Sequence, residues 1–211
     1  MANYQWVGAC LGLAWLTLTA AVPATPAATP WTIDAGKSRV VIEVGKAGML
    51  GFAGHAHEIV APAVRGAVAL DETDWRQSTV TLEFDATALR VSGEGEPPAD
   101  VPQVQQVMLS NRVLDVARFA TVSFKSRRIS IVGGRIGAAD LQIDGDVTLH
   151  GVTRPLSVRA RAALDGSGAL VTRGDFSIKQ TDFGIEPVTA AAGSIRVKDA
   201  VGVQFVLVAH R

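Results

Sequence analysis

The sequence predicts an all-β fold, with one antiparallel eight-stranded barrel and a single short helix. Three features predict it: apolar and polar side chains alternate from Trp31 onward, short turn signals separate the alternating segments, and one segment alone has helical spacing. A length of 211 residues suits one domain of this size.

Eight segments have the period of two that places alternate side chains on opposite faces of a strand. In residues 79–85, for example, Val80, Leu82 and Phe84 alternate with threonines and acids. Each strand should therefore be apolar on one face and solvated on the other. The eight segments are residues 40–44, 64–70, 79–85, 122–131, 141–149, 156–164, 170–178 and 201–209.

Turn signals stand between several of these segments. They are Asp-Glu-Thr-Asp at residues 71–74, Gly133-Gly134, and Asp-Gly-Ser-Gly at residues 165–168. Because such connections are short, neighbouring strands should pair as antiparallel hairpins. Closure into an up-and-down barrel of lipocalin-like size would bury the apolar face and remove both sheet edges. A two-sheet sandwich has the same alternation and stays open as an alternative.

Two segments depart from the strand pattern. Residues 100–109 predict a short helix over the barrel wall or its end, with Asp100 as the cap, Gln103 reaching back to it, and Val104, Val107 and Met108 on one face. Residues 45–57 are rich in glycine around Met49, Leu50 and Phe52. This segment either folds across a barrel mouth or is an ordinary hairpin connection.

Composition excludes several classes of function. Twenty Lys and Arg balance twenty Asp and Glu, and no long basic stretch occurs, which argues against nucleic acid or an anionic membrane surface as a partner. The single cysteine, Cys10, excludes disulfides and cysteine-based zinc sites from the rest of the chain. An apolar fraction of 48% excludes a disordered chain.

The N-terminal segment is interpreted as a signal peptide over residues 1–24, followed by a Pro/Ala/Thr spacer over residues 25–30 and the barrel domain over residues 31–211. No charged side chain precedes Asp34, and an apolar run covers residues 6–21. An uncleaved membrane anchor or lipidation at Cys10 are the alternatives. We expect a periplasmic or secreted protein without stable membrane insertion after cleavage.

The residues indicate binding rather than catalysis, since no nucleophile elbow or pair of carboxylates on an apolar face occurs. The motif His55-Ala56-His57 would point two imidazoles to one side of an extended segment. These rings could cap loop backbone groups, meet the polar head of a ligand, or form part of a metal-dependent site. We predict no catalytic residue and no metal ligand.

The inner face is rich in small side chains, with Gly66, Gly145 and Gly174 at inward positions. Such a wall would leave room for an isoprenoid or acyl chain, at a gain of roughly 0.8 kcal/mol for each methylene removed from water. A solid core remains the alternative. The predicted ligand-binding residues are Val40, Ile42, Phe52, Val80, Leu82, Phe84, Met108, Phe124, Ile143, Phe176 and Ile178, with His55 and His57 at the head group.

Several motifs resemble those of the YceI-like family. Residues 147–156, Val-Thr-Leu-His-Gly-Val-Thr-Arg-Pro-Leu, resemble its central hairpin; residues 31–34 with Ser38 resemble its opening strand. Residues 109–119 followed by 122–126 resemble its helix-to-strand passage, and residues 176–185 and 197–201 its last strands. The resemblance covers about residues 31–209.

The resemblance implies an exported, lipocalin-like barrel that binds a long-chain isoprenoid, or an isoprenoid quinone, without catalysis. Where the family often carries an Arg-Asp pair and a His, this chain has Gln105, Gln106, Val107 and Met108. The expected partner is thus a long-chain isoprenoid or similar lipid, with no other cofactor and no nucleic acid. The sequence leaves open whether the chain forms a homodimer.

Overall fold

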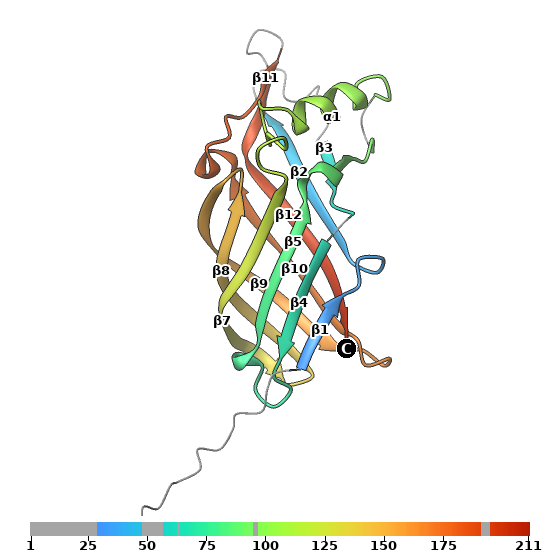
Figure 1. Ribbon diagram of the computed structural model, residues 1–211, viewed down its shortest axis with the longest axis vertical. Helices are drawn as coiled ribbons and strands as arrows, with labels where there is room; N and C mark the ends of the chain where they lie inside the picture. The colour runs from blue at the N-terminus through green and yellow to red at the C-terminus, as the bar shows by residue number, and fades with distance from the viewer. Residues whose placement is uncertain (1–28, 48–56, 63, 95–96, 191–194) are drawn as a thin grey trace, which may run out of the picture.

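The computed structural model describes residues 29–47, 57–62, 64–94, 97–190 and 195–211, and these form one closed antiparallel barrel (Figure 1). The signal-peptide assignment and Cys10 lie outside the described residues, as do Phe52 and His55. Over the described part of the chain, no helix is long and apolar enough to cross a membrane.

Twelve strands, one α-helix and three short 3-10 helices make up the described chain. The strands are β1 (Thr29–Ile33), β2 (Arg39–Ala47), β3 (His57–Val60), β4 (Val64–Leu70), β5 (Thr79–Asp85), β6 (Arg90–Val91), β7 (Thr121–Arg135), β8 (Ala138–Leu149), β9 (Val152–Leu164), β10 (Leu170–Lys179), β11 (Thr189–Ala190) and β12 (Ile195–His210). The helices are α1 (Val101–Leu109), η2 (Trp75–Gln77), η3 (Ala86–Ala88) and η4 (Gln180–Phe183).

The ring of the barrel has eight strand positions, and three of these positions are each occupied by two short strands. β1 and β2 both pair with β12. At the next position, β4 pairs with β1 and β3 pairs with β2; at the one after it, β5 pairs with β4 and β6 pairs with β3. The pairs β1/β2, β3/β4 and β5/β6 are therefore single strands interrupted by short breaks. β7, β8, β9, β10 and β12 complete the ring. The closed ring confirms the predicted barrel and excludes the sandwich.

All eight predicted strand segments lie in described strands, one at each position of the ring. Periodicity missed β3, β6 and β11, which have four, two and two residues and are too short for an alternating pattern. β1 begins at Thr29, inside the range predicted as spacer. Pro30 is tolerated there because β1 pairs at this point with β4 alone, and proline cannot donate to a second ladder.

Two details of the predicted turns and helix are wrong. Gly133 and Gly134 lie within β7, next to a bulge, and the β7–β8 turn is formed by Ile136 and Gly137. The strand runs on through both glycines because Gly134, which pairs with Ala139, adopts its positive φ of 74° without steric cost. Helix α1 is confirmed, but the Asp100 side chain makes no cap hydrogen bond because the Asp100 backbone is already helical.

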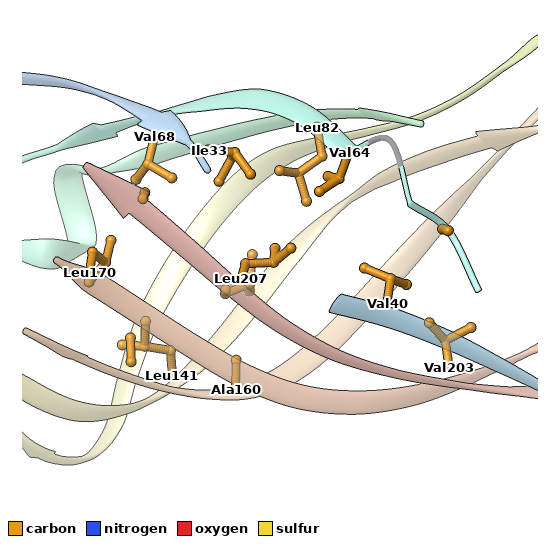
Figure 2. Packing of buried hydrophobic residues seen from close by; sticks show 14 of the residues in the cluster. Ile33, Val40, Val64, Val68, Leu82, Leu141, Ala160, Leu170, Val203 and Leu207 are labelled. Carbon is orange, nitrogen blue, oxygen red and sulfur yellow. The ribbon is translucent and has the colours of Figure 1, made fainter. Parts of the chain in front are cut away.

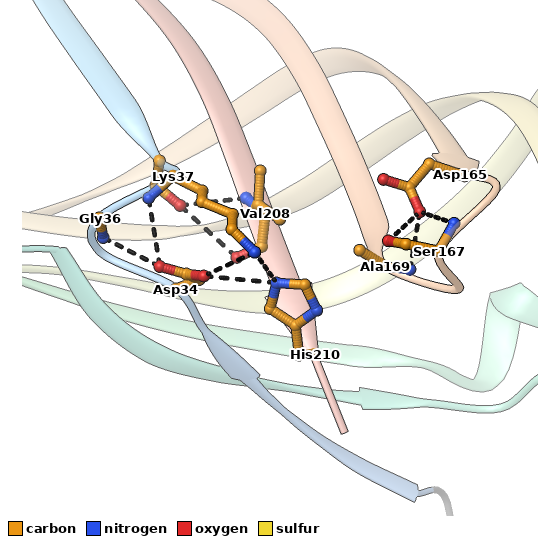
Figure 3. A network of polar contacts seen from close by, with 9 residues as sticks. Asp34, Gly36, Lys37, Asp165, Ser167, Ala169, Val208 and His210 are labelled. Carbon is orange, nitrogen blue, oxygen red and sulfur yellow. Dashed lines mark hydrogen bonds and ion pairs between the residues drawn. The ribbon is translucent and has the colours of Figure 1, made fainter.

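The ring closes where β12 meets the turn between β1 and β2, and polar contacts fix this junction (Figure 3). The backbone N–H of Asp34 donates to the carbonyl of Val208 at 2.8 Å, and the N–H of Val208 donates to Ser38 Oγ at 3.0 Å. The Asp34 carboxylate lies 3.3 Å from His210 Nε2 and 3.5 Å from Lys37 Nζ. The first and last strands are thus held together by side chains as well as by the ladder.

Apolar side chains from all sides of the barrel point inward (Figure 2). Leu141 from β8, Leu207 from β12 and Val68 from β4 are each at least nine-tenths buried. A second, smaller cluster of Val147, Phe183 and Ile185 lies where η4 covers the end of the barrel. Figure 1 shows α1 at this same end, far from the β7–β8 turn.

Candidate functional site

The inward side chains enclose a cavity of about 280 Å³. Its lining includes Leu70 and Ala209 at the end of the barrel near the β7–β8 turn. It also includes Val44, Leu149 and Ile178 at the α1 end. The cavity therefore runs along the barrel axis rather than lying at one mouth.

The cavity is almost wholly apolar. Among the residues that line it, only Ser78, Ser123, Thr172 and Gln180 have hydroxyl or amide side chains, and none of the described lining residues is ionisable. Two of these polar groups already have protein partners. Ser78 Oγ accepts from the Asp71 N–H at 3.0 Å, and Gln180 Nε2 donates to the Lys198 carbonyl at 2.8 Å. The lining thus offers contact to hydrocarbon and little to charge.

Several inward side chains remain partly accessible although they face the axis. Ile42, Val80, Phe84, Phe124 and Phe176 all line the cavity, and each is only partly buried. In a close-packed interior such side chains would be covered on every side. Their accessibility indicates that the centre of the barrel is hollow.

The cavity brings together ten of the eleven predicted ligand-binding residues, of which Phe52 and Met108 were expected near a mouth and the others in the wall. Phe52 lies outside the described residues, and contact of the ten with a ligand stays a prediction. The ten are Val40, Ile42, Val80, Leu82, Phe84, Met108, Phe124, Ile143, Phe176 and Ile178.

Inward glycines do not simply leave space, contrary to the sequence-based expectation. A Cβ on Gly145 would lie 2.6 Å from the Phe124 ring, and a Cβ on Gly174 would lie 2.8 Å from the Phe205 ring. Each phenyl ring therefore lies against the wall over a glycine of the neighbouring strand. This arrangement lets large apolar side chains line the cavity without crossing it.

The end of the cavity near the β7–β8 turn is covered by η2. Trp75 of this helix is 2% exposed and forms part of the lining. Asp74 caps η2 by accepting from the Arg76 N–H at 3.1 Å. Trp31, also 2% exposed, lies nearby on β1, with the Arg211 guanidinium 5.4 Å above its ring.

The α1 end is covered by segments without strand periodicity. Met108 of α1 lines the cavity beside Val113 and Leu114 of the passage that follows the helix. The Gln105 side chain fixes α1 to β6, because its Oε1 accepts from the Val91 N–H and its Nε2 donates to the Leu89 carbonyl, both at 2.8 Å.

Sequence reasoning missed the lining residues that these end segments supply. They follow no period of two, and Trp75 and Gln180 stand between polar residues, so no sequence pattern marks the set. These residues are Trp75, Leu89, Val113, Leu114, Gln180 and Ile185.

Of the predicted head-group residues, the structure describes only His57. It begins β3, pairs with the lining residue Val44 and shares a strand face with Ile59, which also lines the cavity. His57 therefore lies beside the α1 end of the cavity, although it is not itself part of the lining. Within the described ranges, no group of three or more metal-ligating side chains occurs.

Solved structures share this barrel. Burkholderia cenocepacia BcnA matches with a TM-score of 0.66 at 18% identity, covering 84% of this chain and 99% of that one. A polyisoprenoid-binding domain from Saccharophagus degradans matches with a TM-score of 0.63 at 14% identity, covering 87% and 98%. A Campylobacter jejuni YceI protein matches with a TM-score of 0.54 at 10% identity, covering 71% and 82%. These similarities show a shared fold.

A comparison with curated proteins found no match. The family model described as the YceI-like domain matches residues 31–209, which is nearly the whole described chain. The motifs in residues 147–156 and 176–185 fall within this range, on β8, β9, β10 and η4. The chain belongs to the YceI-like family.

Proposed function

We propose that this protein binds a long-chain isoprenoid, or a lipid of similar shape, inside the barrel and serves as a carrier or store rather than as an enzyme. The observation that carries the proposal is the apolar cavity along the barrel axis. Its lining has no ionisable side chain among the described residues, so it offers no acid or base to a bound molecule and none to activate its serine and threonine hydroxyls.

The energetics of the lining favour a hydrocarbon chain. Each methylene that moves from water into the cavity gains roughly 0.8 kcal/mol. A charged group in the same place would lose its hydration without gaining a partner. A long neutral tail therefore suits the cavity better than a compact polar metabolite.

The ligand's polar end is proposed to lie at the α1 end. Trp75 covers the opposite end of the cavity, whereas Gln180 lines the α1 end and His57 lies beside it. Both side chains can hydrogen-bond to a hydroxyl or carbonyl group. The tail would then extend toward Trp75.

Family membership and one structural relative support the ligand class. The Saccharophagus degradans relative is described as a polyisoprenoid-binding domain. The uncharged, apolar N-terminal sequence supports a periplasmic or secreted location. An isoprenoid quinone is one ligand that would combine such a tail with a small polar head.

Native mass spectrometry of protein purified from an exporting host tests the proposal. We expect a bound species whose organic extract contains a long-chain isoprenoid or similar lipid. The emptied protein should then gain thermal stability on addition of a polyprenol, because a ligand of the folded state raises its stability. An empty barrel whose melting temperature ignores polyprenols would contradict the proposal.

A further inference from the structure

One wall of the barrel carries a strong excess of positive charge although the whole chain is neutral. Strands β7, β8, β9 and β10 hold eight Lys and Arg on their outer face but only four Asp. The strands β1 to β6 are balanced, with four of each sign. We call the outer face of β7–β10 the basic wall.

The sequence has no long basic stretch, so it predicted neither this wall nor an anionic membrane partner. The reason is the period of two: outward positions alternate with apolar ones, so the basic residues are spread over three strands, β7, β9 and β10. The sheet order places these strands on one wall of the barrel, with β8 between β7 and β9.

Most of the excess charge lies outside close ion pairs. Three arginines are paired: Arg127 with Asp146, Arg128 with Asp144, and Arg161 with Asp140. Over the described residues, five other basic side chains of the wall lie within 4 Å of no carboxylate. They are Lys125, Arg135, Arg159, Arg173 and Lys179.

The register even places two arginines opposite each other. Arg161 of β9 and Arg173 of β10 are direct cross-strand partners, and the other neighbour of Arg173 is Val206 of β12. Like charges at such positions destabilise a sheet. An external anion would relieve this repulsion.

Exposed aliphatic side chains lie at one end of the same wall. Among the described residues, the large hydrophobic side chains left exposed are Val132, Ile136 and Leu164, at 58%, 43% and 37%. Val132 and Ile136 belong to the β7–β8 hairpin, and the Leu164 N–H donates to the carbonyl of Gly137 in its turn. Arg135, without an acidic partner, stands beside Ile136.

We propose that the basic wall, together with the exposed side chains of Val132, Ile136 and Leu164, docks the protein on an anionic lipid bilayer surface. Basic side chains are attracted to anionic headgroups, and a few exposed aliphatic side chains can enter the interface. The exposed aliphatic side chains favour a bilayer over an acidic protein, because they add apolar contact with the interface that charge pairing alone does not require. Such docking is peripheral and needs no membrane-spanning segment.

Co-sedimentation with vesicles tests the proposal. The full chain should bind vesicles of phosphatidylglycerol mixed with phosphatidylcholine and bind phosphatidylcholine vesicles much less, and added salt should weaken the binding. Residues 1–28 carry no charged side chain, so this segment can respond to headgroup charge only through its terminal amine.

The double variant Arg159→Gln/Arg173→Gln should lower the affinity for mixed vesicles roughly tenfold. Ile136→Ser/Leu164→Ser should lower it several-fold. The matched control is Arg39→Gln/Arg65→Gln, which removes the same charge from β2 and β4 and should leave the affinity nearly unchanged. All variants share the same N-terminal segment, so its contribution cancels.

Three results would overturn the proposal: no binding of the parent chain to mixed vesicles, equal binding to both vesicle types, or an equal loss in the control variant. Absence of binding would point to an acidic protein as the partner of the wall. The proposal does not depend on the bound isoprenoid. None of the substituted side chains lines the cavity, so native mass spectrometry of the same variants reports ligand occupancy separately.

Discussion

At the scale of single residues, strand position decides which side chains face the cavity and which face water. Ile143 and Asp144 are neighbours on β8, yet Ile143 lines the cavity and Asp144 belongs to the outer face. Alternation in the sequence was sufficient to predict this division. It could not predict the partners that Asp144 finds on β7 and β9, because these depend on the register of three strands.

Asp144 should make stability depend on pH. Hydrogen bonds from Ser157, Arg128 and Gln142 lower the pKa of the Asp144 carboxyl from 3.8 to about 2. A lowered pKa in the folded state adds stability above the ordinary pKa, and this stability is lost as pH falls through the lower value. Asp144→Asn should therefore melt below the parent protein at neutral pH, and the difference should shrink as pH falls from about 4 toward 2.

Thermal melts at several pH values check this expectation. Asp175→Asn is the matched control, because Asp175 is an exposed aspartate of β10 with no ion pair to a described residue. A difference between Asp144→Asn and the parent protein that stays constant down to pH about 2 would contradict the assigned role of Asp144.

At the scale of elements, long strands were predictable and interruptions were not. The eight alternating segments have enough residues to display a period, whereas β6 has two residues and its position depends on pairing with β3. Helix α1 was predicted from its spacing, over either the barrel wall or its end, but the contacts that hold it at the end were not. These contacts come from Gln105, which reaches backbone groups fourteen and sixteen residues away in sequence.

Gln105→Ala should loosen α1 from the barrel end. The substitution leaves the Val91 N–H and the Leu89 carbonyl without their partners in a partly buried place, and the expected cost is about 2 kcal/mol of unfolding free energy. Amide hydrogen exchange at Val91 should become faster, since its N–H would lose the protecting acceptor.

Gln106→Ala is the matched control, because Gln106 is the next residue of α1 and its side chain is exposed. Urea unfolding of both variants measures the loss of unfolding free energy, and hydrogen exchange measures the protection of the Val91 N–H. Equal exchange at Val91 in the two variants would show that Gln105 does not hold the helix.

At the scale of the whole molecule, closure and hollowness have different origins. Closure follows from eight half-apolar strands in hairpin order, and the sequence predicted it. Hollowness depends on how rings pack, for instance on Phe124 lying over Gly145 and Phe205 over Gly174, and no period in the sequence reports it. The charge of the basic wall likewise exists only once the ring has formed.

A substitution that fills the cavity tests the hollow barrel most directly. Val203 of β12 lines the cavity, whereas Val206 of the same strand points to the outer face, so Val203→Trp and Val206→Trp make the same change on opposite sides of one wall. We expect both variants to fold. Val203→Trp should raise the polyprenol concentration needed for half-maximal thermal stabilisation roughly tenfold, which corresponds to about 1.4 kcal/mol.

The deciding measurement is a polyprenol titration of the melting temperature for the parent protein and these two variants. The hollow barrel predicts that Val203→Trp loses most of the polyprenol response while Val206→Trp keeps it. A filled barrel would instead make Val203→Trp unstable by roughly 1–3 kcal/mol through overpacking. That instability, together with the same polyprenol response in all three proteins, would contradict the account.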